Sequence, residues 1–313
     1  MKVYRDINEF VNRGNAVVTT GTFDGVHFGH QKIISRLKEV AQQVNGETVI
    51  ITFFPHPRLV LFPEDNDLKL INTLDEKIEL LTNAGIDHLI IIPFTKEFSR
   101  LSSLEFIQQI LAHKIGTKRL VIGYDHHFGK NREGSFEHLK AYAPEYGFQV
   151  EEIPEQDIND VAVSSTKIRN AILKGDVETA NTYLGYAFNL SGVVAKGDQI
   201  GRTIGYPTAN IKVPEQYKLI PGDGIYASQI FIGEKTYEGM LYIGNRPTVN
   251  GLSKVIEVNI FDFEADIYEQ TIKVNFLKYI RGDKKLNGLE ELKMALLEDK
   301  KTCLEFFSKI SKK

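Results

Sequence analysis

The chain has 313 residues, which favours two domains, and its 25% charged and 42% hydrophobic residues are ordinary values for a globular protein. This composition excludes a largely disordered or fibrous chain. The formal net charge of −3 argues against a general binder of nucleic acid or membrane surfaces, and the single cysteine, Cys303, excludes an intramolecular disulfide. No apolar stretch approaches the length of a membrane span, so we expect a cytoplasmic protein, a monomer or a weak homo-oligomer, that binds neither nucleic acid nor membranes.

The first half of the chain alternates short β-branched runs with helical patterns. Strands are predicted at residues 16–20, 48–54, 88–92, 119–122 and 148–153, and helices at 31–44, 75–84 and 102–113. The run Ile90-Ile91-Ile92 is apolar on both faces, as in a parallel sheet covered on both sides. With right-handed crossovers, this alternation predicts a doubly wound α/β domain with a parallel sheet.

Beyond residues 184–185 strands follow strands, and glycines and prolines separate them. Strands are predicted at residues 190–195, 224–232, 236–243, 255–263 and 270–276. Short antiparallel strands in about 100 residues suggest a small β-barrel. A C-terminal helix is predicted at 289–310, with an apolar stripe formed by Leu289, Leu292, Leu296, Cys303, Phe307 and Ile310. We therefore predict two domains, residues 1–184 and 185–313.

The turn after the first strand, TGTFDGVHFGH at residues 20–30, contains three glycines and two histidines. The glycines allow a tight turn, and the start of the next helix offers unpaired N–H groups suited to a phosphate. His27 and His30 are three residues apart and can donate hydrogen bonds to a phosphorus centre that gains charge during displacement. Such a pair is also compatible with zinc or with plain surface histidines, but the one cysteine is far away in the sequence.

A second polar segment, SSTKIR at residues 164–169, opens a helical stretch. Ser164, Ser165 and Thr166 supply hydroxyl groups, and Arg169 supplies a guanidinium, which together suit a polyphosphate. Taken on its own, the segment is better explained by an ordinary helix N-cap with solvated charges. In the same domain as the histidine turn, phosphate binding is the better interpretation.

These two segments resemble the nucleotidyltransferase superfamily, which uses a His-x-Gly-His motif and a second, Ser/Thr-rich motif. More narrowly, TFDGVHFGH at 22–30 and TFFPHP at 52–57 resemble the adenylyltransferase half of the bacterial bifunctional riboflavin kinase/FAD synthetase family. The segment 123–134 is similar to a further family segment, although His126 stands where that family usually has Phe.

The resemblance implies roles for residues of this first domain. It implies that His27 and His30 are catalytic. Contacts to ATP are implied for Gly21, Phe23, Asp24, Gly25, Gly29, Ser164, Ser165, Thr166 and Arg169. A flavin site is implied at Pro55, His56, Pro57 and Asp125. Two rigid prolines that hold an imidazole suit a flat ring, and a strand that is simply ended by prolines is the alternative.

The most informative stretch of the second half is GVVAKGDQIGRTIGYPTAN at residues 192–210. Its glycines free the backbone to wrap a phosphate chain. Thr208 and Asn210 present two neutral oxygens close together, which suit Mg²⁺ because this ion keeps waters and takes substrate ligands. A glycine-rich hairpin without a ligand is the alternative.

The segment GRTIGYPTAN at 201–210 resembles the riboflavin kinase signature, and PGDGIYA at 221–227, IGNRPT at 243–248 and FLKYIR at 276–281 are similar to other segments of that family. Tyr242 stands where the family usually has Asn. Contacts to ATP are implied for Gly197, Gly201, Gly205, Pro207, Thr208 and Asn210, the last two also holding Mg²⁺. The resemblance further implies a catalytic base at Glu257 and a flavin contact at Arg281. A solvated strand face and a surface salt bridge are the respective alternatives.

The resemblance covers nearly the whole chain and implies a bifunctional transferase. Riboflavin would be phosphorylated by ATP to FMN, and AMP would then pass from ATP to FMN, giving FAD and pyrophosphate. The expected ligands are riboflavin, FMN, FAD and ATP, with Mg²⁺. An enzyme with one of the two activities, a flavin-binding regulator and a different nucleotidyltransferase are the alternatives.

Overall fold

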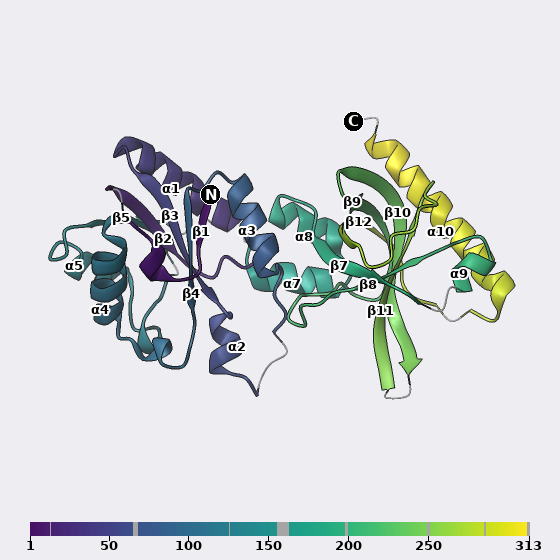
Figure 1. Cartoon of the computed structure of the whole chain (residues 1–313), viewed down its shortest axis with the longest axis horizontal. Coiled ribbons are helices and arrows are strands. Elements are labelled where there is room, and N and C mark those ends of the chain that lie inside the picture. Colours follow the sequence, from purple (N-terminus) through teal and green to yellow (C-terminus); the bar gives the residue numbers. More distant parts are fainter. Residues whose placement is uncertain are drawn as a thin grey trace. The chain divides into compact units, whose positions relative to one another are not determined.

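The computed structural model describes residues 1–12, 14–64, 68–124, 126–154, 163–197, 200–248, 251–284 and 286–311. The chain forms two compact units, Met1–Ser165 and Thr166–Lys313, which we call the first and the second unit. None of the helices within the described ranges has the length and hydrophobicity needed to cross a membrane. Figure 1 shows a sheet with helices in the first unit and a barrel in the second.

The first unit is built on a six-stranded sheet in the order β1-β4-β3-β2-β5-β6, in which all neighbours are parallel. The strands are β1 (Lys2–Tyr4), β2 (Ala16–Thr20), β3 (Glu47–Phe54), β4 (His88–Pro93), β5 (Thr117–Gly123) and β6 (Gln149–Ile153). The predicted doubly wound α/β fold is confirmed. The edge strand β1 was not predicted, because three residues are too few to show a periodic pattern.

Both faces of this sheet are covered by helices. The helices α1 (Phe28–Gln43) and α3 (Leu74–Asn83) cover one face, where Leu37 and Leu81 pack against Val17 and Ile50. The opposite face carries α4 (Ser103–Glu105) with its π-helical continuation η3 (Phe106–Ile115), and α5 (Phe136–Tyr142). Neighbouring strand residues point to opposite faces, so a strand buried on both sides must be apolar throughout. Short helical turns occur at η1 (Ile7–Glu9), α2 (Pro57–Leu61), η2 (Phe98–Arg100) and η4 (Lys130–Arg132).

The second unit is a closed antiparallel barrel in the order β10-β11-β8-β7-β12-β9. Its strands are β7 (Asn189–Ala195), β8 (Ala209–Lys212), β9 (Gly224–Ile232), β10 (Lys235–Thr248), β11 (Gly251–Ile260) and β12 (Thr271–Arg281). Its helices are α7 (Ser165–Leu173), whose first residue ends the first unit, α8 (Val177–Leu184), α9 (Ile200–Thr203) and α10 (Leu289–Ile310). The predicted small barrel with a C-terminal helix is confirmed.

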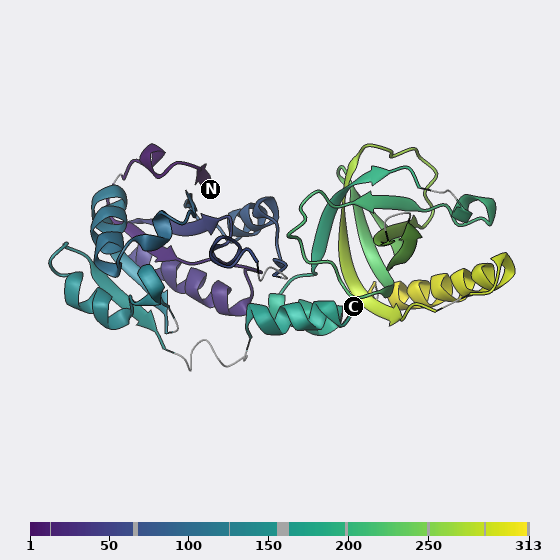
Figure 2. The same ribbon diagram turned by 90° about the horizontal axis from the view of Figure 1, so that it is seen from below.

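The C-terminal helix α10 lies along the outside of the barrel, as Figure 2 shows in yellow. Cys303 and Phe307 pack there against barrel residues, as the predicted stripe required. The ends of the stripe were predicted wrongly, because Leu289 and Ile310 are exposed. A helix of 22 residues is about 33 Å long, so its ends extend past the small core that it covers. Asp299, which was not part of the predicted stripe, lies on the buried side of the helix, one turn before Cys303.

Candidate active sites

The first candidate site lies at the carboxyl end of β2. The chain runs from β2 to β3 and β4 on one side, and then returns to β5 on the other side of β2. Loops that leave neighbouring strands in opposite directions open a crevice at such a switch point, where parallel sheets bind ligands. The histidine turn follows β2 at this position, between the ends of β3 and β5.

The turn between β2 and α1 has a constrained backbone. Phe23 and Val26 have positive φ values of 48° and 39°, and Gly25 has a φ of 92°. Left-handed geometry is strained for a β-branched residue such as Val26, so neighbouring contacts must hold it. Two such contacts are a hydrogen bond from the Ile71 N–H to Asp24 Oδ1 at 2.9 Å and one from Lys77 Nζ to Thr22 O at 2.6 Å.

The two histidines meet at the start of α1, as their spacing predicted. His27 is the residue before the helix, and its side chain makes no capping hydrogen bond. The rings of His27 and His30 stack with centroids 3.8 Å apart and an interplanar angle of 19°. Burial, and after it the neighbours His27 and Lys77, lower the pKa of His30 well below its usual value. His30 is therefore neutral at pH 7 and can donate from only one ring nitrogen.

Two buried polar atoms at this site lack a hydrogen-bond partner among the described residues. They are Thr20 Oγ1, at the end of β2, and His30 Nδ1. Buried polar groups are nearly always hydrogen-bonded, so orphaned ones at a strand end point to a site that a polar ligand completes. The protein has thus folded into a shape that leaves hydrogen-bonding capacity for a ligand.

The structure brings the start of the second motif to the histidine turn. Ser165 Oγ donates to the backbone oxygen of Asp24 at 2.9 Å, although 141 residues separate them. Ser164 directly precedes it. Thr166 and Arg169 follow on α7 and belong to the second unit.

Asp24 has a role that its sequence motif did not predict. Its side chain is buried, and its carboxylate accepts hydrogen bonds from the backbone N–H groups of Ile71 and Asn72, just before α3. The carboxylate thereby ties the histidine turn to the start of another helix. This contact could not be found from the sequence, since the two segments are far apart in it.

The segment with two prolines follows β3, next to β2. His56 is the residue before α2, and its Nδ1 accepts a hydrogen bond from the Arg58 N–H at 3.2 Å. Asp125, predicted for the flavin site, lies outside the described residues. Beside it, the His126 ring stacks on Phe128 at 5.7 Å, and burial, followed by His127 and Arg132, lowers the pKa of His126 to about 4.

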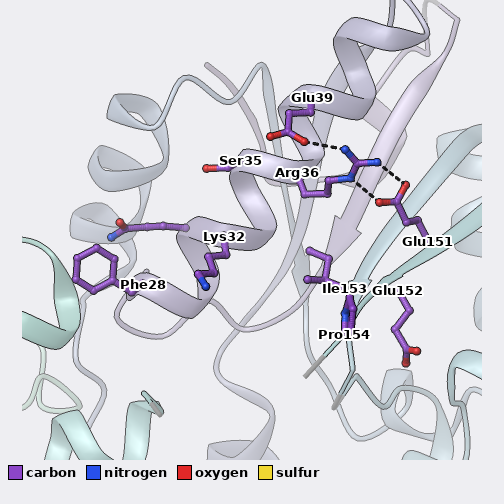
Figure 3. Close-up of a pocket in the computed structure, with 10 residues that line it drawn as sticks. Phe28, Lys32, Ser35, Arg36, Glu39, Glu151, Glu152, Ile153 and Pro154 are labelled. Atoms are coloured by element: carbon purple, nitrogen blue, oxygen red, sulfur yellow. Dashed lines mark hydrogen bonds and ion pairs between the residues drawn. The ribbon is translucent and has the colours of Figure 1, made fainter. Parts of the chain in front are cut away.

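A cavity of about 430 Å³ opens beside the first half of α1, as Figure 3 shows. It is lined by residues of α1 and of the end of β6, namely Phe28, Gln31, Lys32, Ser35, Arg36, Glu39, Glu151, Glu152, Ile153 and Pro154. Arg36 lies between Glu39 and Glu151 and forms ion pairs with both carboxylates. The sequence analysis did not predict these residues, because all of them except Phe28 lie outside its motifs. Only Phe28, next to His27, carried a hint by its position.

The second candidate site lies on one face of the barrel. Glu257 on β11 is directly opposite Tyr242 on β10 and Asn210 on β8. Residues directly opposite each other in antiparallel strands present their side chains on the same face. Thr208 Oγ1 donates to Glu257 Oε2 at 3.3 Å. The predicted base and the predicted Mg²⁺ ligands therefore form one cluster.

Glycines and one amide shape the backbone around this cluster. A Cβ on Gly197 would come within 2.2 Å of Asn210 Nδ2, so the close approach requires glycine, and Gly205 has a φ of 85°. The Asn259 amide donates to Pro207 O at 2.7 Å and fixes the segment before Thr208. Gly201 lies in the short helix α9 between the two glycines. The predicted ATP residues of the barrel thus precede Asn210 in one segment of the chain, and Gly197 lies directly against its side chain.

The oxygen atoms of this cluster are suited to Mg²⁺. In the part of the chain that the structure describes, no group of three or more His, Cys, Asp and Glu side chains could hold a metal ion. Thr208, Asn210 and Glu257 instead offer a hydroxyl, an amide and a carboxylate oxygen. Mg²⁺ prefers oxygen ligands and is usually held by few protein groups together with waters and substrate phosphates.

Arg281 and Tyr242 have partners that the sequence did not reveal. Arg281 Nε and one terminal nitrogen each lie 2.7 Å from a carboxylate oxygen of Asp299, which is buried on α10. The hydroxyl of Tyr242 donates to Asp283 at 3.1 Å. Burial, followed by Asp283, raises the pKa of Tyr242 to about 12. The first contact connects the end of β12 to the middle of α10, and the second connects β10 to the segment between β12 and α10.

Two family models match this chain, one in each half. Residues 10–167 match the family model for FAD synthetase, and residues 184–307 match the model for riboflavin kinase. A bifunctional riboflavin kinase/FMN adenylyltransferase from Listeria monocytogenes is 38% identical over 95% of this chain and 94% of its own length. One from Escherichia coli is 36% identical over 98% of both chains. A solved structure from Streptococcus pneumoniae, described as a macrolide-efflux protein, has a TM-score of 0.87 and 32% identity over 96% of this chain and 98% of its own. The chain therefore belongs to the family of bifunctional riboflavin kinase/FMN adenylyltransferases.

Proposed function

We propose that this chain makes FAD from riboflavin in two steps, each at one of the two sites. The barrel transfers the terminal phosphoryl group of ATP to riboflavin, giving FMN and ADP. The first unit then transfers AMP from a second ATP to FMN, giving FAD and pyrophosphate. The observation that carries the adenylyl transfer is the hydrogen bond of Ser165 to the histidine turn, which joins the two nucleotidyltransferase motifs.

In adenylyl transfer, a phosphate oxygen of FMN attacks the α-phosphorus of ATP in line with the bond to the β-phosphate. The new P–O bond forms as that bond breaks, and pyrophosphate leaves with the bonding electrons. His27 and His30 donate hydrogen bonds to the oxygens that gain charge, together with the N–H groups at the start of α1. No proton has to leave the nucleophile, because the FMN phosphate is already an anion.

The other predicted residues of this site would bind the remaining parts of the two substrates. Gly21, Phe23, Asp24, Gly25 and Gly29 shape the turn around the phosphates. Ser164, Ser165, Thr166 and Arg169 would hold the departing pyrophosphate. The flavin ring would lie at Pro55, His56, Pro57 and Asp125. We infer that the cavity beside Phe28 receives the adenosine end of ATP, since it begins in the same helical turn as His30 and has one aromatic wall.

In riboflavin phosphorylation, the terminal hydroxyl of the ribityl chain is a weak nucleophile at neutral pH. Glu257 would accept its proton while the hydroxyl oxygen bonds to the γ-phosphorus and the bond to ADP breaks. Gly197, Gly201, Gly205 and Pro207 would wrap the phosphates of ATP. Thr208 and Asn210 would hold Mg²⁺, which when bound neutralises charge on the phosphates. Arg281 would contact the flavin from the end of β12.

We propose that the two functions divide at Leu184, with residues 1–184 serving adenylyl transfer and residues 185–313 serving the kinase. The boundary between the two compact units lies earlier, after Ser165. The match to the FAD synthetase model ends at residue 167, and the match to the riboflavin kinase model begins at residue 184. Helix α7 would then serve the first function through Ser165, Thr166 and Arg169, and α8 would belong to the same domain.

A chromatographic time course with purified protein, riboflavin, ATP and Mg²⁺ tests this proposal. FMN should form first and then convert to FAD. FMN that accumulates without FAD would show that only the kinase is active. If no product forms, FMN is supplied directly, and FAD would then show that only the adenylyltransferase works. Flavin binding without ATP consumption would overturn the proposal in favour of a flavin-binding regulator.

A further inference from the structure

Lys77 is a buried lysine at the first site that no motif includes. It lies in the first part of α3, with only 5% of its surface exposed. Its ammonium group donates to Thr22 O at 2.6 Å, within the turn that carries the histidines. Lysine is almost never fully buried unless it is paired, so this position needs an explanation.

The energetics of the position indicate that its charge has a use. Removing an ammonium group from water is strongly unfavourable unless the group is well paired. The carboxylate of Asp24 lies close enough to favour the charge, but it also accepts hydrogen bonds from the N–H groups of Ile71 and Asn72. Burial prevails, and it lowers the pKa of Lys77 to about 8. A methionine would fill similar space without this cost.

The charge of Lys77 influences the protonation of His30, one of the two proposed catalytic histidines. It is one of the causes that lower the pKa of His30, after burial and His27. The titratable groups that interact with Lys77 are therefore Asp24 on the turn, which is charged, and His30 on α1. Glu76, its neighbour on α3, caps that helix with Thr73. With His30 neutral, the only positive charge among these groups is that of Lys77, and ATP brings negative charge to the same turn.

We propose that Lys77 is a positioning residue for adenylyl transfer, which fixes the phosphate-binding turn through the Thr22 carbonyl and supplies a buried positive charge that bound polyphosphate balances. The proposal rests on the proposed adenylyltransferase function. It implies a linkage between protonation and substrate binding. ATP binds the protonated form of Lys77 better, so raising the pH through about 8 should weaken ATP binding at this site.

The test is the KM for ATP in FAD formation from supplied FMN, measured at pH 7 and pH 9. With a pKa of about 8, the protonated fraction falls about tenfold between these values, so the KM of the unaltered protein should rise about tenfold. Lys77→Arg keeps the charge at both pH values, and its KM should stay low and nearly constant. Lys77→Gln keeps a donor for Thr22 O but no charge, and its KM should be high and nearly constant.

Lys38 offers a matched control in the same unit. Its ammonium group also donates to a backbone oxygen, that of Ala84, at 2.9 Å. Lys38→Gln should leave the KM and its pH dependence as they are in the unaltered protein. The KM for ATP in FMN formation from riboflavin should be the same in all variants, which shows that each is folded in the second unit.

The results distinguish a failure of the inference on Lys77 from a failure of the proposed adenylyltransferase function. If the unaltered protein makes FAD and Lys77→Gln has the same KM at pH 7, the inference on Lys77 is overturned while the proposed function stands. A tenfold pH effect that persists in Lys77→Arg overturns it as well, because the titrating group is then another one. If the unaltered protein makes no FAD from FMN, the proposed adenylyltransferase function itself fails, and the inference fails with it.

Discussion

The surroundings of His30 determine its protonation state. An imidazole on the surface is half protonated near pH 6.5, whereas burial, His27 and Lys77 hold this one in the neutral form. A neutral imidazole still donates one hydrogen bond, and it avoids a strong ion pair with ATP in the ground state. Stabilisation is then concentrated on the charge that develops during transfer.

This state of His30 predicts a flat pH profile for the chemical step. Because the pKa of His30 lies well below 6.5, the residue does not change its charge between pH 6.5 and 8. We therefore expect the kcat of FAD formation, at saturating ATP and FMN, to stay level over this range. A kcat that falls steadily as the pH rises through 6.5 would mean instead that the protonated imidazolium is the active form.

The buried charge of Lys77 also predicts a pH-dependent effect on stability. The folded-state pKa of about 8 lies below the ordinary lysine value of 10.5, so the unfolded chain binds the proton more tightly. The free energy of unfolding should therefore rise as the pH increases from about 8 to 10.5, and the charge should cost about 3 kcal/mol at pH 7. Lys77→Met removes this cost but also removes the shorter of the two hydrogen bonds to Thr22 O, leaving the one from Thr52 Oγ1 at 3.3 Å, and this loss offsets about 1 kcal/mol.

We accordingly expect Lys77→Met to be more stable than the unaltered protein at pH 7, with an advantage that shrinks by pH 9.5. Urea unfolding at the two pH values measures the difference. Lys38→Gln serves as the control, since its ammonium is only half-buried. If Lys77→Met is destabilised equally at both pH values, the buried charge contributes nothing to the pH dependence.

At the scale of elements, an ion pair with a buried carboxylate adds to the apolar contacts that hold the C-terminal helix α10 on the barrel. Arg281, the last residue of β12, holds the buried carboxylate of Asp299 with two hydrogen bonds of 2.7 Å each. Removing one partner of such a pair leaves an uncompensated buried charge, whereas replacing both partners by apolar residues is often neutral. This asymmetry separates a structural role of Arg281 from contact with the flavin.

We expect Arg281→Met to lower the free energy of unfolding of the barrel by about 3 kcal/mol. The double variant Arg281→Met/Asp299→Leu should regain most of that stability. If Arg281 also contacts riboflavin, the KM for riboflavin should remain raised in the double variant although the protein is stable again. A normal KM in the double variant would limit Arg281 to holding α10. Urea unfolding and kinase kinetics on the same samples give both readings.

The elements themselves were largely predictable from the sequence, for reasons that differ between them. Strands β2 and β9 were predicted with their observed bounds, since glycines or polar residues sharply limit their apolar runs. Strand β8 was missed, because its first two residues belong to the glycine-rich segment 192–210, where composition suggests a loop. Burial of Asp299 was missed because a carboxylate interrupts an apolar stripe, and only its pairing with Arg281 makes the position favourable.

At the scale of the whole molecule, the proposed catalytic residues of the two reactions, His27 and His30 on one hand and Glu257 on the other, lie in separate compact units, each with its own core. A change to one cluster should therefore leave the other reaction intact. We expect His30→Ala to reduce FAD formation from FMN by about 10²-fold or more, with FMN formation nearly unchanged. Glu257→Ala should reduce FMN formation from riboflavin by about 10²- to 10⁴-fold and leave adenylylation of supplied FMN intact.

Separate assays with riboflavin and with FMN measure the two rates on the same preparation. Loss of both reactions in either folded variant would show that the sites depend on each other. The sequence could predict this division, since the motifs fall in two blocks. It could not predict the burial of Lys77, the hydrogen bonds of Asp24 to residues 71 and 72 or the cavity beside Phe28, because burial and contacts between distant segments are not visible in a linear pattern.

The position of Ser165 has a consequence for anyone who would recombine these enzymes. This serine is the last residue of the first unit and also the first residue of α7, whose remainder belongs to the second. A chimaera joined at the compact boundary would place a foreign helix directly after the hydroxyl that contacts the histidine turn. A junction after Leu184, where α8 ends before the first barrel strand, keeps that helix with its own serine. Kinase barrels are therefore best exchanged at the later position.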